Sequence, residues 1–268
     1  MDQPKLIPKS RARLSQVLQN AGDLISIEDV STALQIERRE ATKLLARWNT
    51  QGWIQRLRRG IYAPVPLASL GQDQVLEDPW LIVPTLFGPA YVGGWTAAEH
   101  WGLTEQTFRG VCVLTTRPVR RKEETIQGVK FFLKHVSLRA MFGTKALWRG
   151  RVKVQISGPA KTIIDMLDDP AIGGGIRHAG DCLDNLLSEG RGSPEELISV
   201  AESLGNGAIF KRLGFLAERR GGPEELIAAC RDRLTTGNSK LDPAVPSHRL
   251  VKRWRLWTPP SWLETRAT

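Results

Sequence analysis

Residues 37–63 constrain the fold of this chain more than any other stretch, because they join an amphipathic helix to a short basic hairpin. Leu44, Leu45 and Trp48 recur at helical spacing, which predicts that one side of the helix is buried. Gly52 follows where a helix commonly ends, because glycine takes positive φ without strain. The stretch therefore predicts a helix that packs one side against other elements and presents the opposite side to solvent.

A two-stranded hairpin is predicted directly after this helix. Residues 54–57 and 61–63 are short extended runs, and Pro64 stops the pairing of the second run. Residues 58–60, with the sequence Arg-Arg-Gly, form the predicted turn. The hairpin would therefore carry arginines at its tip.

Basic residues gather on the predicted exposed side of the helix and on the hairpin. The candidate DNA-contacting residues are Arg38, Arg39, Thr42, Lys43, Arg47, Arg56, Arg58 and Arg59. Such a helix fits the major groove of duplex DNA, and such a hairpin reaches backbone phosphates or a narrow minor groove. Taken alone, the pattern also fits an ordinary solvated basic face, and the elements upstream favour the first interpretation.

Two further helices are predicted upstream. Residues 10–21 place Leu14 and its apolar neighbours on one helical face. Ser26, followed by Asp29, resembles the capping start of a short helix that carries its own apolar stripe. The order of helix, short helix, tight turn, third helix and two-stranded wing predicts a winged helix-turn-helix.

The net charge of the chain favours a polyanionic partner. The 268 residues carry a formal net charge of +10, and the sequence pI is about 9.9. Residues 1–65 hold eleven Lys or Arg and six Asp or Glu, so their net charge is 11 − 6 = +5. Half of the excess positive charge thus lies with the helix and hairpin, and nucleic acid is a common partner of such regions.

The chain is long enough for two domains, and hydrophobic residues make up 41% of it, which allows a sizeable core. We expect an α+β protein with an N-terminal winged helix-turn-helix (1–65) and a linker (66–77). A mixed α/β domain with a small sheet and a helical C-terminal part (78–237) should follow, and then a Trp-rich basic tail (238–268). The tail is predicted to be an extended strap that either packs back on a domain or holds a partner.

Three strands are predicted in the second domain, at 110–116, 128–136 and 151–156. The basic loop 117–122 between the first two is either a second phosphate contact or a hairpin tip kept soluble by its charges. From Gly158 onward the chain is predicted to be mainly helical.

Residues of the types used in catalysis have simpler interpretations here. Asp165, Asp168 and Asp169 are close in sequence, but acids at a helix end are usually solvated, so we expect no active site. Gly173 to Gly175 precede a helix and suit a phosphate cradle, yet no Walker pattern occurs, which favours a flexible connection. We therefore expect a protein that is not an enzyme and needs no cofactor.

Cys112, Cys182 and Cys230 are far apart and odd in number, which supports neither a zinc site nor a disulfide framework. Each is expected to be a small buried hydrophobe in a reducing cytoplasm. The opening residues, MDQPKLIPKS, lack the apolar core of a signal peptide, and no apolar run approaches the roughly 20 residues of a membrane helix. A cytoplasmic protein without a membrane partner is therefore expected.

Three segments resemble the AbiEi family of antitoxins, the regulator half of type IV bacterial toxin–antitoxin pairs. They are RRGIYAPVP (58–66), DPWLIVPTLFGPAYVGGWTAAEHWGLTEQ (78–106), and SGPAKTIIDMLDDP with the glycines that follow it (157–175). The resemblance implies a transcriptional repressor whose winged helix binds repeats in its own promoter. It also implies a C-terminal domain that opposes a nucleotidyltransferase toxin encoded beside it.

Two other functions are compatible with the residues. One is a winged-helix transcription factor with a small-molecule sensor domain, which predicts a closed apolar pocket in the second domain. The other is an enzyme that acts on nucleic acid and uses the winged helix for targeting, which predicts carboxylates that converge on one point.

Overall fold

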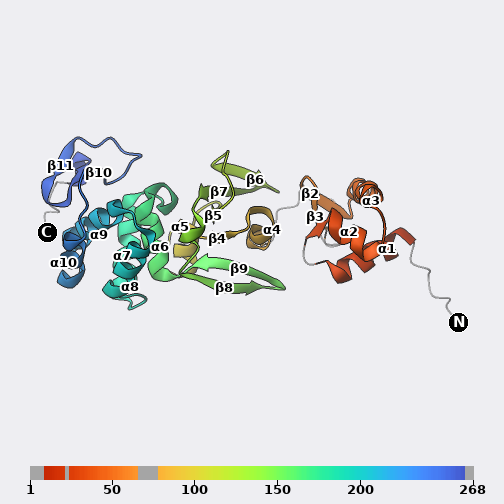
Figure 1. Cartoon of the computed structure of the whole chain (residues 1–268), viewed down its shortest axis with the longest axis horizontal. Coiled ribbons are helices and arrows are strands. Elements are labelled where there is room, and N and C mark those ends of the chain that lie inside the picture. The colour runs from red at the N-terminus through yellow and green to blue at the C-terminus, as the bar shows by residue number, and fades with distance from the viewer. Residues whose placement is uncertain (1–8, 22–23, 66–77, 263–268) are drawn as a thin grey trace. The chain divides into compact units, whose positions relative to one another are not determined.

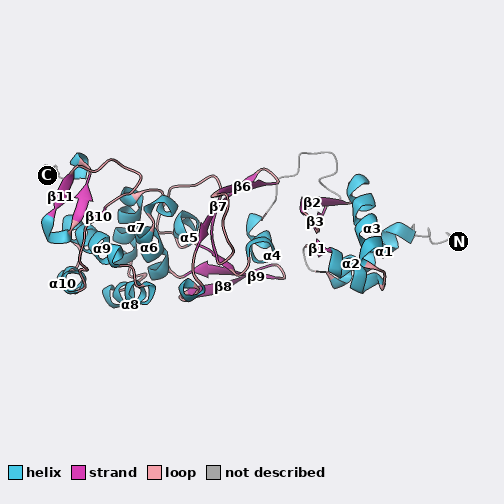
Figure 2. Ribbon diagram, turned by 45° about the horizontal axis from the view of Figure 1, so that its top comes forward, coloured by secondary structure: helices cyan, strands magenta, loops and turns pink. Residues whose placement is uncertain are grey.

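The computed structural model describes residues 9–21, 24–65 and 78–262 of a mixed α/β protein with several sheets (Figures 1 and 2). Its residues divide into two compact units. The first contains Met1–Leu86, Thr125–Val129 and Trp148–Val154, and the second contains the rest. The predicted linker, 66–77, lies outside the described residues.

Three helices and a small sheet make up the N-terminal elements. They are α1 (Lys9–Asn20), β1 (Ile25–Ser26), α2 (Ile27–Leu34), α3 (Arg38–Thr50), β2 (Ile54–Arg58) and β3 (Ile61–Pro64). The sheet has the order β1-β3-β2, and both pairs are antiparallel. The three predicted helices and the hairpin are confirmed.

Local signals explain where these elements begin, and burial explains how they pack. The Asp29 amide donates to Ser26 Oγ at 3.1 Å, and the Ser26 amide donates to the Asp29 carboxylate at 2.7 Å. This reciprocal capping box starts α2, as the sequence predicts. Leu45 and Trp48 from α3 are fully buried, and Trp48 Nε1 donates to Ser10 Oγ at 3.1 Å. The apolar side of α3 thus packs into the core, and its opposite side is exposed to solvent.

A six-stranded sheet with the order β6-β7-β5-β4-β9-β8 organises the following residues. Its strands are β4 (Ala90–Val92), β5 (Val111–Thr115), β6 (Glu123–Ile126), β7 (Val129–His135), β8 (Thr144–Arg149) and β9 (Val152–Ser157). The strands predicted at 110–116, 128–136 and 151–156 are confirmed as β5, β7 and β9. The edge strands β6 and β8 are not predicted, because their exposed residues give a weak apolar pattern.

The connection 117–122 is not a hairpin tip, because β5 and β7 are parallel neighbours. A parallel pair requires a crossover, and here the loop leads to edge strand β6 before the chain turns back into β7. The actual turn is Gln127-Gly128, where both residues have positive φ, 46° and 74°. That conformation is typical of a two-residue hairpin turn with the twist of a sheet.

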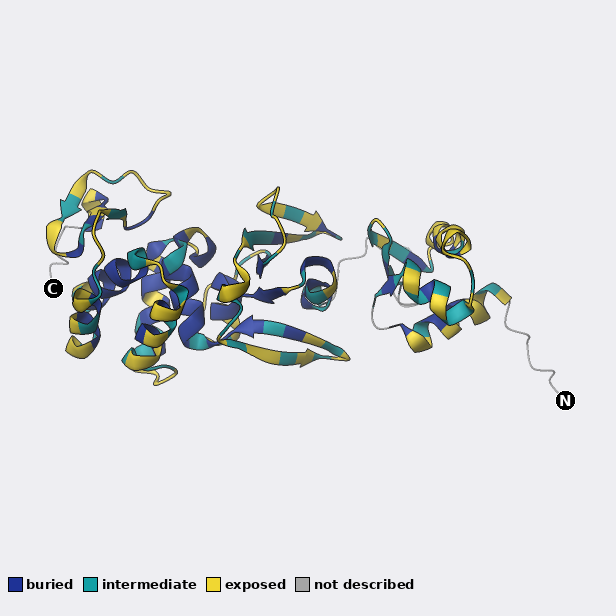
Figure 3. Cartoon of the chain, viewed as in Figure 1, coloured by how far each residue is buried: buried dark blue, intermediate teal, exposed yellow. Residues whose placement is uncertain are grey.

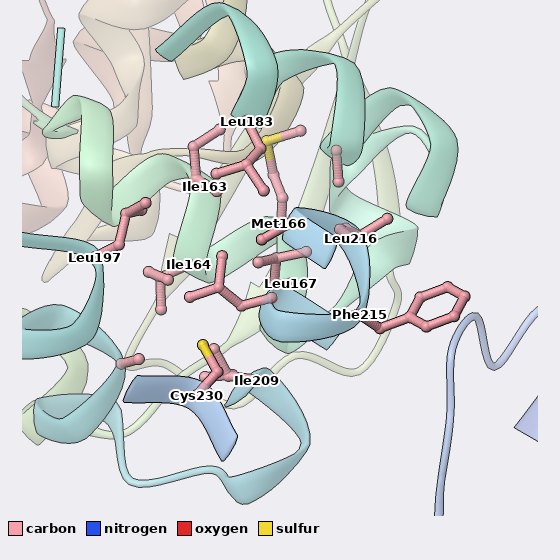
Figure 4. Close-up of a cluster of buried hydrophobic side chains, with 14 of the residues drawn as sticks. Ile163, Ile164, Met166, Leu167, Leu183, Leu197, Ile209, Phe215, Leu216 and Cys230 are labelled. Atoms are coloured by element: carbon pink, nitrogen blue, oxygen red, sulfur yellow. The ribbon is translucent and has the colours of Figure 1, made fainter. Parts of the chain in front are cut away.

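Helices flank the sheet and form the larger core. They are the 3-10 turn η2 (Pro79–Ile82), then α4 (Val83–Phe87), α5 (Gly94–His100), α6 (Pro159–Asp168), α7 (Ile176–Ser188), α8 (Pro194–Leu204), α9 (Gly207–Arg220) and α10 (Glu224–Asp232). Helix α6 is buried along almost its whole length (Figure 3). Ile163, Ile164 and Leu167 project from it among side chains of the surrounding helices (Figure 4).

The tail is a folded module rather than an extended strap. Its strands, β10 (Ser239–Lys240), β11 (Arg249–Val251) and β12 (Leu256–Thr258), form a sheet with the order β10-β12-β11. Trp254 is fully buried, and its Nε1 donates to Glu218 on α9 at 2.6 Å. A Cβ at Gly214 of α9 would come within 2.1 Å of the Trp254 ring, so the glycine allows this close packing. Of the two options predicted for the tail, packing back on a domain is the one observed.

Candidate nucleic-acid interface

The outer side of α3 presents a row of exposed residues. Arg39, Thr42, Lys43 and Ala46 follow one another at i, i+3, i+4 and i+7, opposite the buried Trp48, and all four are exposed. A small residue beside two cations leaves room for another molecule to approach the helix. Ala46 was not among the predicted contacts, although its helical spacing from Arg39 would have indicated it.

Arg38 and Arg47 lie at the margins of this row. Arg38 forms an ion pair with Glu28 from α2, and both side chains are largely exposed. Thr42 donates its hydroxyl proton to the Arg38 carbonyl at 2.8 Å, which leaves the hydroxyl oxygen as an acceptor. The centre of the face therefore belongs to Arg39 and Lys43, with Arg38 already engaged by a carboxylate.

The hairpin stands next to the C-terminal end of α3. The Arg56 amide donates to Asn49 Oδ1 at 2.9 Å, so Asn49 ties strand β2 to the helix. Arg58 closes β2 instead of standing in the turn, and its guanidinium donates to the Leu86 carbonyl at 3.1 Å. The turn consists of Arg59, which is exposed, and Gly60, which has φ of +80°. The pairing register shifts between Arg56 and Arg58, and the turn has two residues instead of the predicted three.

The eight predicted residues fall into three groups. Arg39, Thr42 and Lys43 share the exposed face of α3, Arg38 and Arg47 flank it, and Arg56, Arg58 and Arg59 belong to the hairpin. Across residues 37–63 there are seven basic and two acidic side chains, so the net charge is 7 − 2 = +5. An exposed surface with this excess attracts polyanions.

A second group of polar side chains is buried in the other unit. Lys161 Nζ donates to Asp165 at 2.5 Å and to the Tyr91 hydroxyl at 3.0 Å, and Tyr91 donates to Asp165 at 2.9 Å. The three residues are at most 2% exposed. Burial raises the pKa of Asp165, against the opposing effect of Lys161, and it also raises the pKa of Tyr91. The three side chains hydrogen-bond to one another, which is typical of a buried polar network that stabilises a fold.

The other two carboxylates of the predicted acidic cluster, Asp168 and Asp169, share Lys134 as an ion-pair partner, at 2.6 and 3.6 Å. Asp168 accepts from Lys134 Nζ at 2.6 Å and from the Asn206 amide at 2.7 Å. Burial alone would raise the pKa of Asp168, but the Lys134 charge and these hydrogen bonds outweigh it and lower the pKa. Asp169 accepts from the Ala171 amide at the start of the next turn. In the part of the chain that the structure describes, no three or more His, Cys, Asp or Glu side chains are grouped so that they could hold a metal ion.

At the glycines before α7, the chain itself supplies an anion to the start of the helix. The Asp242 carboxylate accepts from the Ile176 amide at 3.1 Å, where a phosphate would bind.

The three cysteines are free and buried, and burial raises the pKa of Cys182 and of Cys230 to about 12.

Comparison with known proteins does not place the chain in a family: no family model matches it, and no curated protein does. Within residues 9–21, 24–65 and 78–262, no helix is both long and apolar enough to span a membrane.

Proposed function

We propose that residues 9–65 form a winged helix-turn-helix and that the chain is a DNA-binding transcriptional repressor. One observation carries this proposal: α3 buries Trp48 on one side and exposes Arg39, Thr42 and Lys43 on the other, beside an arginine-tipped hairpin. An α-helix about 10–12 Å wide fits the major groove, which is about 12 Å wide.

Two kinds of contact follow from this arrangement. Arg39 and Lys43, near the start of α3, face base edges, and Arg39 pairs with the two acceptors of a guanine. Arg56 and Arg59 on the hairpin hold backbone phosphates, which orient the protein but carry no sequence information directly. All four residues are exposed, which leaves each of them accessible to DNA.

Binding titrations on an operator duplex and a scrambled duplex test the division. Arg39→Ala should weaken operator binding by about 1–3 kcal/mol and affect the scrambled duplex much less. The Arg56→Ala/Arg59→Ala variant should weaken binding to both duplexes. It should also flatten the slope of log K against log salt by about 1.8, or 0.9 per phosphate. Lys130→Ala, which removes one exposed cation from β7, is the matched control and should change neither. If Arg39→Ala lowered the affinity for both duplexes equally, the proposed contact of Arg39 with base edges would be contradicted.

We propose further that this repressor is the antitoxin of a type IV toxin–antitoxin pair. The support is the resemblance carried by residues 58–66, 78–106 and 157–175, and the third segment contains the buried Lys161–Asp165 pair. The opposing activity against a nucleotidyltransferase toxin then resides in residues beyond Asp78.

Growth rescue in cells that express the toxin from the neighbouring gene tests this second part. The Arg39→Ala/Lys43→Ala variant should lose promoter repression and keep rescue, because the two activities use different residues. Loss of rescue by a folded Arg39→Ala/Lys43→Ala protein, or no rescue by the natural chain, would refute the assignment.

A further inference from the structure

The hairpin formed by β8 and β9 exposes an aromatic ring. Trp148 is 68% exposed, although β8 is an ordered strand at the edge of the six-stranded sheet. Figure 3 shows that most of β8 is not buried. A single exposed apolar side chain is common on protein surfaces, so the ring is interpreted together with the charged residues around it.

Two cations stand beside this ring. Only Gly150 and Arg151 separate the neighbouring strands, and pairing through a two-residue turn would place Arg149 opposite Val152 and Trp148 opposite Lys153. Directly opposed residues of an antiparallel pair project from the same face. Lys153 and Arg151 are exposed as Trp148 is. The hairpin therefore presents a ring with a lysine at its side and an arginine at the adjoining turn.

The charge around the ring is positive, and two of its cations have no anionic partner among the described residues. Residues 144–156 contain four basic residues and no acidic residue. Two of the four have partners: Lys145 lies over the Trp101 ring, and Arg149 pairs with Asp78 at 3.4 Å and lies over the Trp80 ring. Arg151 and Lys153 form no ion pair with another described residue. Both remain available for an external anion.

We infer that the β8–β9 hairpin binds single-stranded nucleic acid, with a base stacked on Trp148 and backbone phosphates held by Lys153 and Arg151. Stacking platforms flanked by cations are the physical basis of such binding, because every base has a ring face and every nucleotide has a charge. A duplex covers its base faces within the helical stack, so an exposed ring gains most from unpaired bases. This site uses other residues than the α3 face and does not depend on the proposed operator binding.

The test uses the full chain and fluorescently labelled oligothymidine and oligouridine, with anisotropy as the readout. Trp148→Ala should weaken binding about 5- to 150-fold, the effect of losing one stacked base. Trp148→Phe should keep most of the affinity because it keeps a ring, and Trp148→Leu should behave like the alanine variant. Arg151→Gln/Lys153→Gln should flatten the salt slope by about 1.4, or 0.7 per phosphate.

Two controls separate this site from the rest of the protein. Trp257→Ala removes another partly exposed tryptophan, 37% exposed on β12, and should leave oligonucleotide binding unchanged. Arg39→Ala/Lys43→Ala should weaken duplex binding and leave the effect of Trp148→Ala on oligothymidine intact. Thermal melting of each variant confirms folding, and an exposed position such as 148 tolerates the change.

Several results would overturn the inference. One is the absence of binding to either oligonucleotide at low salt, and another is an unchanged affinity in Trp148→Ala. A third is an equal oligonucleotide affinity in the Trp148→Phe and Trp148→Leu variants. A loss on duplex DNA but not on oligothymidine would assign the hairpin to duplex binding instead. Competition by polyglutamate as effective as that by oligothymidine would show an acidic protein surface to be the partner.

Discussion

Replacement of Lys161 by methionine should destabilise the protein strongly and in a pH-dependent way. The variant removes the ammonium that donates to Asp165 at 2.5 Å. It leaves a carboxylate that is 2% exposed, with the Tyr91 hydroxyl as its remaining side-chain donor among the described residues. Breaking a buried ion pair on one side costs about 3–5 kcal/mol. That is a large part of the roughly 5–15 kcal/mol that stabilises a typical domain.

The pH dependence follows from the sign of the Asp165 pKa shift. Burial already raises this pKa against the effect of Lys161, and removal of Lys161 should raise it further. A carboxyl group with a raised folded-state pKa stabilises the fold below its unfolded pKa of about 4, and this stability is lost as pH rises through the folded pKa. The loss caused by Lys161→Met should therefore be smaller near about pH 4 than near about pH 7.

Urea unfolding followed by circular dichroism measures these effects. Replacing both partners, as Lys161→Met/Asp165→Leu, should restore stability to within about 2 kcal/mol of the natural chain, because no unpaired charge remains. Lys130→Met is the matched control: this lysine is exposed, and its loss should change stability by about 0.5 kcal/mol or less. A Lys161→Met protein as stable as the natural chain, or equally destabilised at both pH values, would refute the reasoning.

Three further changes test the packing and the charges. Trp48→Ala should cost about 3–5 kcal/mol in urea unfolding, and an unchanged midpoint would mean that α3 packs by another face. Gly214→Ala should cost about 1–3 kcal/mol, because its Cβ would collide with the buried Trp254 ring; a stable variant would contradict that contact. Lys134→Met should destabilise at neutral pH and progressively less in acid. Because the pKa of Asp168 is lowered in the folded protein, this carboxylate stabilises the fold above its unfolded-state pKa, and the stability is lost as the pH falls through its folded-state pKa. A loss of stability in Lys134→Met that stays constant with pH would contradict the role of this ion pair.

Features that depend on neighbouring residues were predictable from the sequence. The period of Leu45 and Trp48 identified the buried side of α3, and the Ser26–Asp29 pair identified the start of α2. Both signals act within one or two helical turns, so a local pattern contains them completely. The same reasoning placed the predicted contacts Arg39 and Lys43 on the exposed side.

Tertiary structure decided what depends on residues distant in sequence. Loop 117–122 became a crossover because β7 pairs with β5 in parallel, and strand pairing is not visible in a local pattern. Asp165 was expected to be solvated, yet Tyr91, 74 positions away, helps to bury it. Asp242 closes the start of α7 from 66 positions downstream, and Arg58 meets the carbonyl of Leu86. Such contacts join residues that are far apart in sequence, so they form only when the whole chain folds. Composition and local periodicity do not specify them.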